Sequence, residues 1–331
     1  MTEKMRCRRI VSGAVTSVVL VAISLCGLLF AVPPSAASAA NTSENDAWNW
    51  LRPATSDAQV LGAVKTAQNL QTLPNNVQPG LTVTTDGAGV GTGKCPNTSG
   101  VMALQGCAFG DLKSKKLMVV YGDSHAAMWA EALQIIAKRT GWKLVVFAFP
   151  GCPLPDLQLI SAQTNGPNTQ CQQFHMLAVP AIKKLHPNLL IVTSESTAQT
   201  SVGVDATPTQ WQSGLMKSFA SLSEPGTTMV MIGDIPQWPL DDADCLAAHM
   251  TSVQNCAASP TQAVSANVQA EQRAAKLNGI KYVSTTAWVC AAKCEPIVGN
   301  IRVYNNQYHF GAIYTAYLSE PLQQALGLGS E

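Results

Sequence analysis

Between residues 117 and 283, short apolar runs alternate with helical segments, and few folds accommodate that alternation. The apolar runs predict buried strands at residues 117–121, 143–149, 188–192, 228–232 and 281–283. The intervening and following segments predict helices at residues 126–139, 171–185, 208–222, 260–277 and 311–326. Apolar strands separated by helices indicate a parallel sheet covered on both faces. We therefore expect an α/β protein, a three-layer α/β/α sandwich around a parallel sheet of about five strands.

The first 40 residues have the features of an export signal. A basic start is followed by an uncharged run over residues 10–32 and by Ala37-Ser38-Ala39, a pattern typical of a cleavage site. The run is also long enough to span a bilayer, so an uncleaved membrane anchor is the alternative to a cleaved signal peptide. In both cases the rest of the chain is exported to the cell envelope, either membrane-anchored or secreted.

The exported part divides into an arm and a main domain. Residues 41–115 have a weak pattern, and residues 74–96 are rich in turn-forming residues, so we expect an irregular lead-in arm packed on the main domain. The main domain is predicted to cover residues 116–328. The net charge is +1 and only 12% of residues are charged, which leaves no basic stripe for a nucleic acid.

Ten cysteines are present, and two of them, Cys7 and Cys26, belong to the leader. The remaining eight, an even number in an exported chain, predict disulfides. Sequence alone does not determine their connectivity. Taken in order they pair as Cys95–Cys107, Cys152–Cys171, Cys245–Cys256 and Cys290–Cys294. Because no histidines flank the cysteines at zinc-ligand spacing, no metal or other cofactor is expected.

The candidate nucleophile is Ser124, in the segment Gly122-Asp123-Ser124-His125 between the first predicted strand and its helix. A serine at that turn exposes its hydroxyl at the carboxyl edge of the sheet, where open α/β sheets bind ligands. The N–H groups at the helix start can receive an oxyanion there.

A serine nucleophile needs a general base. Four of the five histidines have local structural explanations, but His309 lies in a polar loop that opens the last predicted helix. Such a loop can return to the edge that carries Ser124, so His309 is the predicted base. His125, beside the serine, and Trp238, after the fourth strand, are the side chains predicted to contact substrate.

Four blocks in order resemble the SGNH (GDSL-like) hydrolase superfamily, and most closely the SGNH domains found with bacterial acyltransferase-3 membrane proteins. The blocks are residues 74–81 with Cys95 and 107–111, residues 122–125, Phe149-Pro150-Gly151-Cys152-Pro153, and residues 303–309 with 314–318. The resemblance spans roughly residues 60–328 and implies a flavodoxin-like sheet. It also implies that Ser124 is the nucleophile, His309 the base, and the N–H groups of Ser124 and Gly151 part of the oxyanion hole. Asp123 would shape the turn and would not be the triad acid.

The chain departs from the family pattern at two places. Asn306 stands where the family has the triad aspartate, and an amide orients an imidazole without stabilising the imidazolium as a carboxylate does. After the third strand, Thr193-Ser194-Glu195-Ser196 contains no oxyanion-hole asparagine. Ser194 or Ser196 replaces that donor, or the donor is missing.

We therefore expect an exported serine O-acyltransferase or O-acyl esterase, acting on envelope carbohydrate or glycolipid through an acyl-serine. The resemblance implies an acyltransferase-3 membrane protein as a separate partner. The alternative is a catalytically impaired domain of the same fold that binds envelope glycan or that partner, and Asn306 is the residue that favours it.

Overall fold

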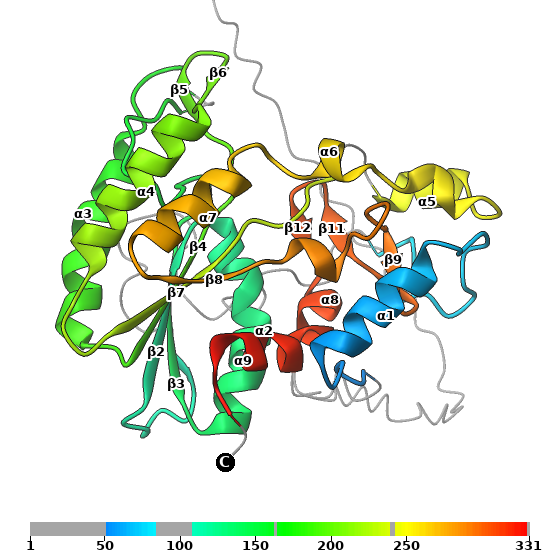
Figure 1. Ribbon diagram of the computed structural model, residues 1–331, viewed down its shortest axis with the longest axis horizontal. Coiled ribbons are helices and arrows are strands. Elements are labelled where there is room, and N and C mark those ends of the chain that lie inside the picture. The colour runs from blue at the N-terminus through cyan, green and yellow to red at the C-terminus, as the bar shows by residue number, and fades with distance from the viewer. Residues whose placement is uncertain (1–50, 84–107, 162–163, 239–241, 330–331) are drawn as a thin grey trace, which may run out of the picture. The chain divides into compact units, whose positions relative to one another are not determined.

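The computed structural model describes residues 51–83, 108–161, 164–238 and 242–329 (Figure 1). The predicted leader, residues 1–40, and the predicted Cys95–Cys107 pair lie outside these residues. Within the described ranges, no helix has both the length and the apolar character needed to cross a bilayer.

A six-stranded sheet forms the centre of the molecule, in the order β1-β3-β2-β4-β7-β8. Its strands are β1 (Ala108–Gly110), β3 (Lys143–Ala148), β2 (Leu117–Gly122), β4 (Leu189–Thr193), β7 (Thr228–Ile232) and β8 (Lys281–Val283). All neighbours pair in parallel except the edge strand β1, which runs antiparallel to β3. The five predicted strands are confirmed, and β1 is an addition. Because β2 lies between β3 and β4, the strand order reverses beside it, and this reversal makes the carboxyl end of β2 a topological switch point.

Alternate residues of β2 point into two different cores, which confirms the three-layer sandwich. Met118 and Val120 belong to the core under α2 (Ser124–Thr140), α8 (Ala312–Tyr317) and α9 (Ser319–Leu326). Val119 and Tyr121 belong to the core under α3 (Thr169–Leu185), α4 (Pro208–Leu222) and α7 (Val268–Leu277). The two helix layers lie on opposite sides of the sheet in Figure 1. Burial on both faces explains why the strand sequences are continuously apolar.

Two predicted helices are each divided in the structure. The segment 260–277 forms α6 (Pro260–Ala263) and α7, because the Asn267 amide donates hydrogen bonds to the carbonyls of Ser196 at 2.8 Å and Ala206 at 3.2 Å. The helix is therefore interrupted between α6 and α7, where Asn267 binds the segment that follows β4. The last predicted helix is divided at Leu318 into α8 and α9.

The remaining elements are short and lie around the sandwich. They are α1 (Asp57–Ala67), the hairpin β5 (Gln199–Ser201) and β6 (Val204–Asp205), α5 (Asp242–Ala248), η4 (Val253–Cys256), η5 (Thr286–Trp288), β9 (Ile297–Val298), β10 (Ile301–Arg302), β11 (Tyr304–Asn306) and β12 (His309–Phe310). Disulfides join Cys152 to Cys171, Cys245 to Cys256 and Cys290 to Cys294, as predicted.

The described part of the lead-in arm packs on the main domain. Val60 and Val64 of α1 are buried in the same core as α2. The buried Arg302 guanidinium donates to the carbonyls of Gly80 at 3.3 Å and Val83 at 2.8 Å, and its Nε lies 3.6 Å from Asp242 Oδ2. One arginine therefore fastens the arm to the segment that leads toward His309.

Candidate functional site

Ser124 is the first residue of α2, directly after the central strand β2. A Cβ atom on Gly122 would lie 1.8 Å from the Thr193 carbonyl oxygen, so only glycine allows β2 and β4 to approach this closely before the turn. Asp123 caps the helix, since its carboxylate accepts hydrogen bonds from the His125 N–H at 2.8 Å and the Glu195 N–H at 2.9 Å. Burial raises the pKa of Asp123 to about 7, against the opposing effect of His125. Asp123 therefore shapes the turn, in agreement with the role that the family resemblance implies.

His309 and Asn306 are brought together by the β11–β12 hairpin. Asn306 Oδ1 lies 2.9 Å from His309 Nδ1 and also accepts a hydrogen bond from the Tyr308 N–H at 2.9 Å. An amide oxygen at Nδ1 selects the tautomer that carries its proton there, which leaves the lone pair on Nε2. His309 Nε2 is buried and has no hydrogen-bond partner within the described residues. The arrangement leaves Nε2 ready to accept a proton.

The hairpin packs against the first turns of the nucleophile helix. The Phe310 N–H lies 3.1 Å from the Met128 sulfur, and the His309 and His125 rings have their centroids 5.2 Å apart. Burial, followed by the charge of His125, lowers the pKa of His309 to about 4, so the imidazole is neutral at ordinary pH.

A buried charge pair, which the sequence prediction missed, lies beneath His309. His125 Nδ1 is 3.0 Å from Asp234 Oδ1, and both side chains are fully buried. Burial alone would lower the pKa of His125, but the carboxylates of Asp234 and, more weakly, Asp123 raise it to about 9. Asp234 Oδ2 accepts hydrogen bonds from the Ser196 N–H at 2.9 Å and the Ser196 hydroxyl at 2.6 Å. The pair joins the start of α2 to the loops that follow β4 and β7.

A second buried carboxyl group supports this pair. Glu271 Oε2 accepts hydrogen bonds from the Asp234 N–H at 3.1 Å and the Tyr282 hydroxyl at 3.1 Å. Burial, reinforced by the nearby Asp234, raises the pKa of Glu271 well above its ordinary value. Gly233 leaves room for the tyrosine, since a Cβ there would lie 1.9 Å from the Tyr282 hydroxyl oxygen.

The two N–H groups predicted to receive an oxyanion belong to Ser124 and Gly151. The Ser124 N–H is at the start of α2, where helical N–H groups have no intrahelical partner. Gly151 has a φ of 71° in the loop after β3, beside the Cys152–Cys171 disulfide, and its N–H makes no hydrogen bond within the described residues. The predicted donor role of Ser194 has no support in this geometry, because its buried hydroxyl donates to the Glu195 carbonyl at 2.8 Å. The Ser196 hydroxyl is likewise engaged, by Asp234.

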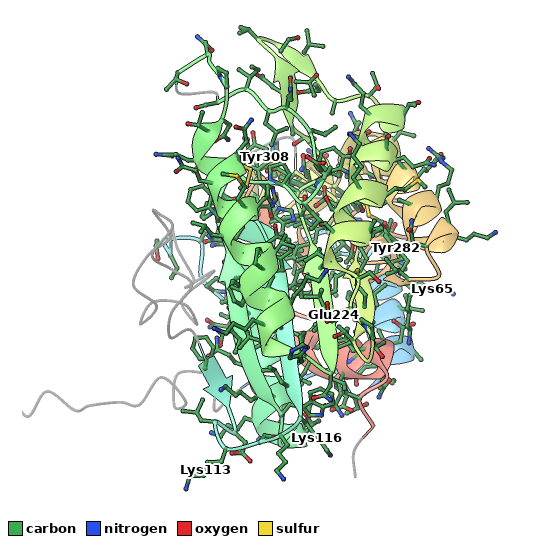
Figure 2. The ribbon with its side chains drawn as sticks, turned by 90° about the vertical axis from the view of Figure 1, so that its left-hand side faces the viewer. Lys65, Lys113, Lys116, Glu224, Tyr282 and Tyr308 are labelled. Carbon is green, nitrogen blue, oxygen red and sulfur yellow. A yellow bond between two sulfur atoms is a disulfide. The ribbon has the colours of Figure 1, made fainter. Side chains whose placement is uncertain are left out.

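A polar cleft of about 790 Å³, which we call the active-edge cleft, opens beside these groups. Asp123, Gly151, Glu195 and Tyr308 line the part nearest the nucleophile turn. Figure 2 shows Tyr308 in the upper half of the molecule and Lys116, which directly precedes β2, near the bottom, so the cleft belongs to the carboxyl edge of the sheet. Half of the other lining residues carry amide, hydroxyl or carboxylate groups, namely Ser161, Asn168, Gln170, Thr197, Gln199 and Asp205. The other half are apolar, namely Phe149, Pro150, Pro153, Leu159, Ile160 and Ala198.

The two side chains predicted to contact substrate do not line this cleft. His125 is fully buried against Asp234. Trp238 is buried, with its ring centroid 5.2 Å from that of Tyr304, and its backbone N–H donates to the Gln307 carbonyl at 2.7 Å. The geometry does not support the predicted substrate contact of either residue. Both belong to the packing that positions the His309 hairpin.

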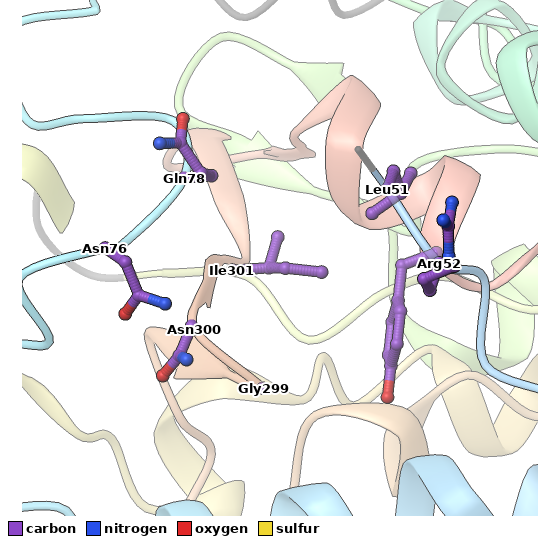
Figure 3. A pocket seen from close by; sticks show the side chains of 8 residues that line it. Leu51, Arg52, Asn76, Gln78, Gly299, Asn300 and Ile301 are labelled. Carbon is purple, nitrogen blue, oxygen red and sulfur yellow. The ribbon is translucent and has the colours of Figure 1, made fainter. Parts of the chain in front are cut away.

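A separate cavity of about 470 Å³ lies between the lead-in arm and β9–β10 (Figure 3). Ile301 lies between Asn76 and Gln78 on one side and Leu51 and Arg52 on the other. None of the predicted site residues lines this cavity, so it contributes nothing to the chemistry of Ser124.

A family model described as the SGNH domain fused to AT3 domains matches residues 94–324. In structure, the chain is similar to the periplasmic domain of a lipopolysaccharide acetyltransferase from Salmonella serovar Paratyphi A. That match has 15% identity and a TM-score of 0.58, over 73% of this chain and 97% of that domain.

Weaker similarities exist to an acylhydrolase from Bacteroides fragilis and a GDSL-like lipase from Bacteroides thetaiotaomicron. The first has 13% identity and a TM-score of 0.41 over 66% of this chain and 89% of that one. The second has 14% identity and a TM-score of 0.39 over 65% and 90%. No curated protein sequence matches the chain significantly. At these identities the structural similarity establishes the fold alone.

Proposed function

The chain belongs to the family of SGNH domains that are fused to AT3 domains, and on that premise we propose that it is a serine O-acyltransferase or O-acyl esterase. Its substrate is an acylated carbohydrate or glycolipid of the cell envelope. The observation that carries the proposal is the state of His309, whose Nδ1 is held by Asn306 while Nε2 is buried and without a partner. A neutral imidazole held in that way can accept the proton of a serine hydroxyl.

In the first half-reaction Ser124 Oγ attacks the acyl carbonyl carbon while its proton passes to His309 Nε2. The N–H groups of Ser124 and Gly151 stabilise the negative charge on the carbonyl oxygen. The C–O bond to the leaving alcohol then breaks, and His309 returns the proton to that alcohol. In the second half-reaction a sugar hydroxyl or water attacks the acyl-serine, His309 takes its proton, and Ser124 Oγ leaves with that proton restored.

The lining of the active-edge cleft supports a carbohydrate as the acyl acceptor or donor. Amide, hydroxyl and carboxylate groups there can exchange hydrogen bonds with several sugar hydroxyls, and Tyr308, which is 47% exposed, offers an aromatic face. Glu195 is held for such a role, since its Oε1 accepts hydrogen bonds from the Thr197 hydroxyl at 2.7 Å and the Gln237 amide at 3.2 Å. A fixed carboxylate costs less entropy to engage than a mobile one.

The family relationship also suggests where this chemistry takes place. We propose an extracytoplasmic location, with the N-terminal segment acting as a signal peptide or anchor, and an AT3-type membrane protein as the acyl donor. Co-purification from membranes of cells producing the full chain tests this partnership. Recovery of the chain without any AT3 protein after mild cross-linking would argue against it.

The proposed activity is tested by covalent labelling of the exported chain with an alkyl fluorophosphonate, followed by intact-mass measurement. One label per folded molecule is expected, and none in Ser124→Ala or His309→Ala variants, because an ordinary serine hydroxyl is not nucleophilic enough to react. A wild-type chain that is folded, disulfide-bonded and unlabelled would contradict the enzymatic proposal.

The second candidate is a catalytically impaired domain that binds envelope glycan or the membrane partner, and Asn306 is the observation that favours it. An unlabelled wild type that still retains envelope polysaccharide on an affinity column would support this candidate. Replacing Asn306 by aspartate separates a slow enzyme from a binding domain, because only the former gains rate from a carboxylate.

A further inference from the structure

A third cavity, of about 620 Å³, lies between α3 and α4, and we call it the α3–α4 groove. The two helices run side by side on the face of the molecule turned toward the viewer in Figure 2. The groove has Tyr121 on its floor and Leu157, Met176, Val179 and Leu222 among its lining side chains. Its volume is in the range of cavities that bind small organic molecules.

The polar atoms of the groove floor are already paired within the protein. The Tyr121 hydroxyl bonds His175 Nδ1, and His175 Nε2 lies 3.2 Å from the Pro153 carbonyl oxygen. The Ser218 hydroxyl donates to the Leu154 carbonyl at 2.7 Å and accepts from the Asp156 N–H at 2.9 Å. Burial lowers the pKa of His175, which keeps the ring neutral. The groove therefore presents a mainly apolar floor to a ligand.

A metal ion does not fit this place. Cys152 and Cys171, whose sulfur atoms lie near His175, are joined to each other in a disulfide. Both ring nitrogens of His175 have partners. Polar side chains, among them Gln172 and Lys217, also line the groove, but its surface is mainly apolar. A hydrocarbon suits such a surface, because it needs no hydrogen bonds from the wall.

The groove adjoins the active-edge cleft. Leu159 and Asn168 line both cavities and are joined by a hydrogen bond from the Asn168 N–H to the Leu159 carbonyl at 2.8 Å. The Asn168 amide nitrogen lies 3.5 Å from the carbonyl oxygen of Gly151, a predicted oxyanion donor. The two cavities therefore meet beside the loop that carries Gly151, which is where an acyl chain would pass from the cleft to the groove.

We propose that the α3–α4 groove binds the hydrocarbon chain of an acyl group longer than acetyl, while the sugar occupies the active-edge cleft. This inference rests on the proposed acyl transfer at Ser124 and extends it to the identity of the acyl group. It assigns roles to Val179 and Met176, which lie on α3 outside the reacting centre.

The test is a series of p-nitrophenyl esters from acetate to decanoate with the exported chain. The wild type is expected to gain about two- to fourfold in kcat/KM per methylene until the groove is full, as partial to complete burial of each methylene would give. Val179→Trp fills the groove and is expected to flatten this series while leaving acetate hydrolysis unchanged. Leu177→Trp is the matched control, since Leu177 is exposed on the same helix and does not line the groove.

A second variant guards against misfolding. Met176 is 66% exposed, so Met176→Glu places a charge at the groove with little risk to the fold and should also reduce the gain per methylene. The inference is overturned if kcat/KM of the wild type does not rise with ester chain length, or if it rises and neither variant reduces the rise. Rapid acetate hydrolysis with a flat series leaves the proposed function intact and removes only the groove, whereas loss of acetate hydrolysis and of fluorophosphonate labelling rejects the proposed function itself.

Discussion

Asn306 is the residue that most strongly limits His309 as a base. Its neutral oxygen accepts from His309 Nδ1 at 2.9 Å, and burial together with the charge of His125 lowers the pKa of His309 to about 4. Activity that needs a neutral imidazole should therefore fall only as the pH drops through about 4. At neutral pH the proposed base is available but weak.

The variant Asn306→Asp is expected to raise kcat/KM for an aryl acetate at neutral pH by about 10- to 100-fold, because a carboxylate stabilises the imidazolium formed during proton transfer. The same charge favours protonated His309, so the acid limb of the pH profile should move upward by about one to three pH units. Measured pH–rate profiles check both effects. Asn306→Ala serves as the control, and an acid limb that moves upward in it as well would exclude the carboxylate as the cause.

His125 and Asp234 form a buried pair whose members depend on each other. Breaking such a pair by removing one partner costs about 3–5 kcal/mol, because the other remains buried without compensation. We expect Asp234→Asn and His125→Gln to show this loss in urea denaturation. The double variant should recover most of it. Equal losses in all three variants would mean that packing, not charge, explains the effect.

The pH dependence of stability provides a second measurement on this pair. Because folding raises the pKa of His125 from 6.5 to about 9, its protonation favours the folded state. This contribution is complete below pH 6.5 and is lost as the pH rises through about 9. The stability of the wild type should therefore fall relative to that of the double variant over that interval. A difference that is constant with pH would show that His125 does not titrate with the expected pKa.

At the residue scale, local motifs made part of the site predictable. Ser124 follows an apolar strand, and His309 with Asn306 lies in one short polar loop. Asp234 offered a weaker signal, an acidic residue just after the fourth strand, and its importance emerges only when the sheet brings that strand beside the start of α2. Glu271 gave no signal, since a glutamate on a helix is ordinarily exposed. The buried charge network therefore depends on tertiary contacts that the sequence pattern does not encode.

Among the elements, β2 depends on a glycine at its carboxyl end. A Cβ on Gly122 would lie 1.8 Å from the Thr193 oxygen, so Gly122→Ala must separate β2 from β4. We expect a loss of about 3 kcal/mol or more, at the upper end of overpacking effects. The urea midpoint measures this loss, and retention of wild-type stability would contradict the close approach of the strands.

Gly62→Ala is the matched control for this substitution. Gly62 is exposed in the middle of α1, and a Cβ there meets nothing within 4 Å. Alanine in a helix interior is expected to increase stability by about 0.5–1 kcal/mol. If Gly122→Ala lowers the stability and Gly62→Ala raises it, the loss at Gly122 is due to the steric clash and not to the change in backbone entropy.

Predictions of strands and helices succeeded where neighbouring residues determine the structure, and failed where contacts distant in the sequence determine it. The five parallel strands were predictable because each is buried on both faces and hence continuously apolar. The three-residue edge strand β1 has too few residues to show a pattern. The helix predicted over 260–277 failed because Asn267 uses its side chain to bond Ser196 and Ala206, carbonyls far away in the sequence. The periodicity of apolar residues along the sequence does not indicate such a hydrogen bond.

For the whole molecule, the sheet order places the loops after β2, β3, β4 and β7 at one edge. The segments that follow these strands hold Ser124, Gly151, Glu195 and Asp234 respectively, so four segments that are distant in the sequence contribute to the candidate site. The β11–β12 hairpin adds His309 from the far end of the chain. The Cys152–Cys171 disulfide connects the loop after β3 to α3.

Removal of that disulfide by Cys152→Ala with Cys171→Ala is expected to reduce stability by about 3 kcal/mol, given its sequence separation of 19. The larger effect should be on rate, because a displaced Gly151 N–H costs about 100-fold in kcat when an oxyanion donor is lost. The Cys290→Ala and Cys294→Ala pair, with a separation of only 4, is the control and should retain the wild-type rate where folded. Fluorophosphonate labelling and ester hydrolysis, measured at a temperature below the unfolding midpoints of both double variants, compare their activities.

If both double variants remain folded and equally active, the disulfide serves stability alone. Gly151 is then positioned by other contacts of its loop, such as the hydrogen bond from the Cys152 N–H to the Phe149 carbonyl at 3.1 Å.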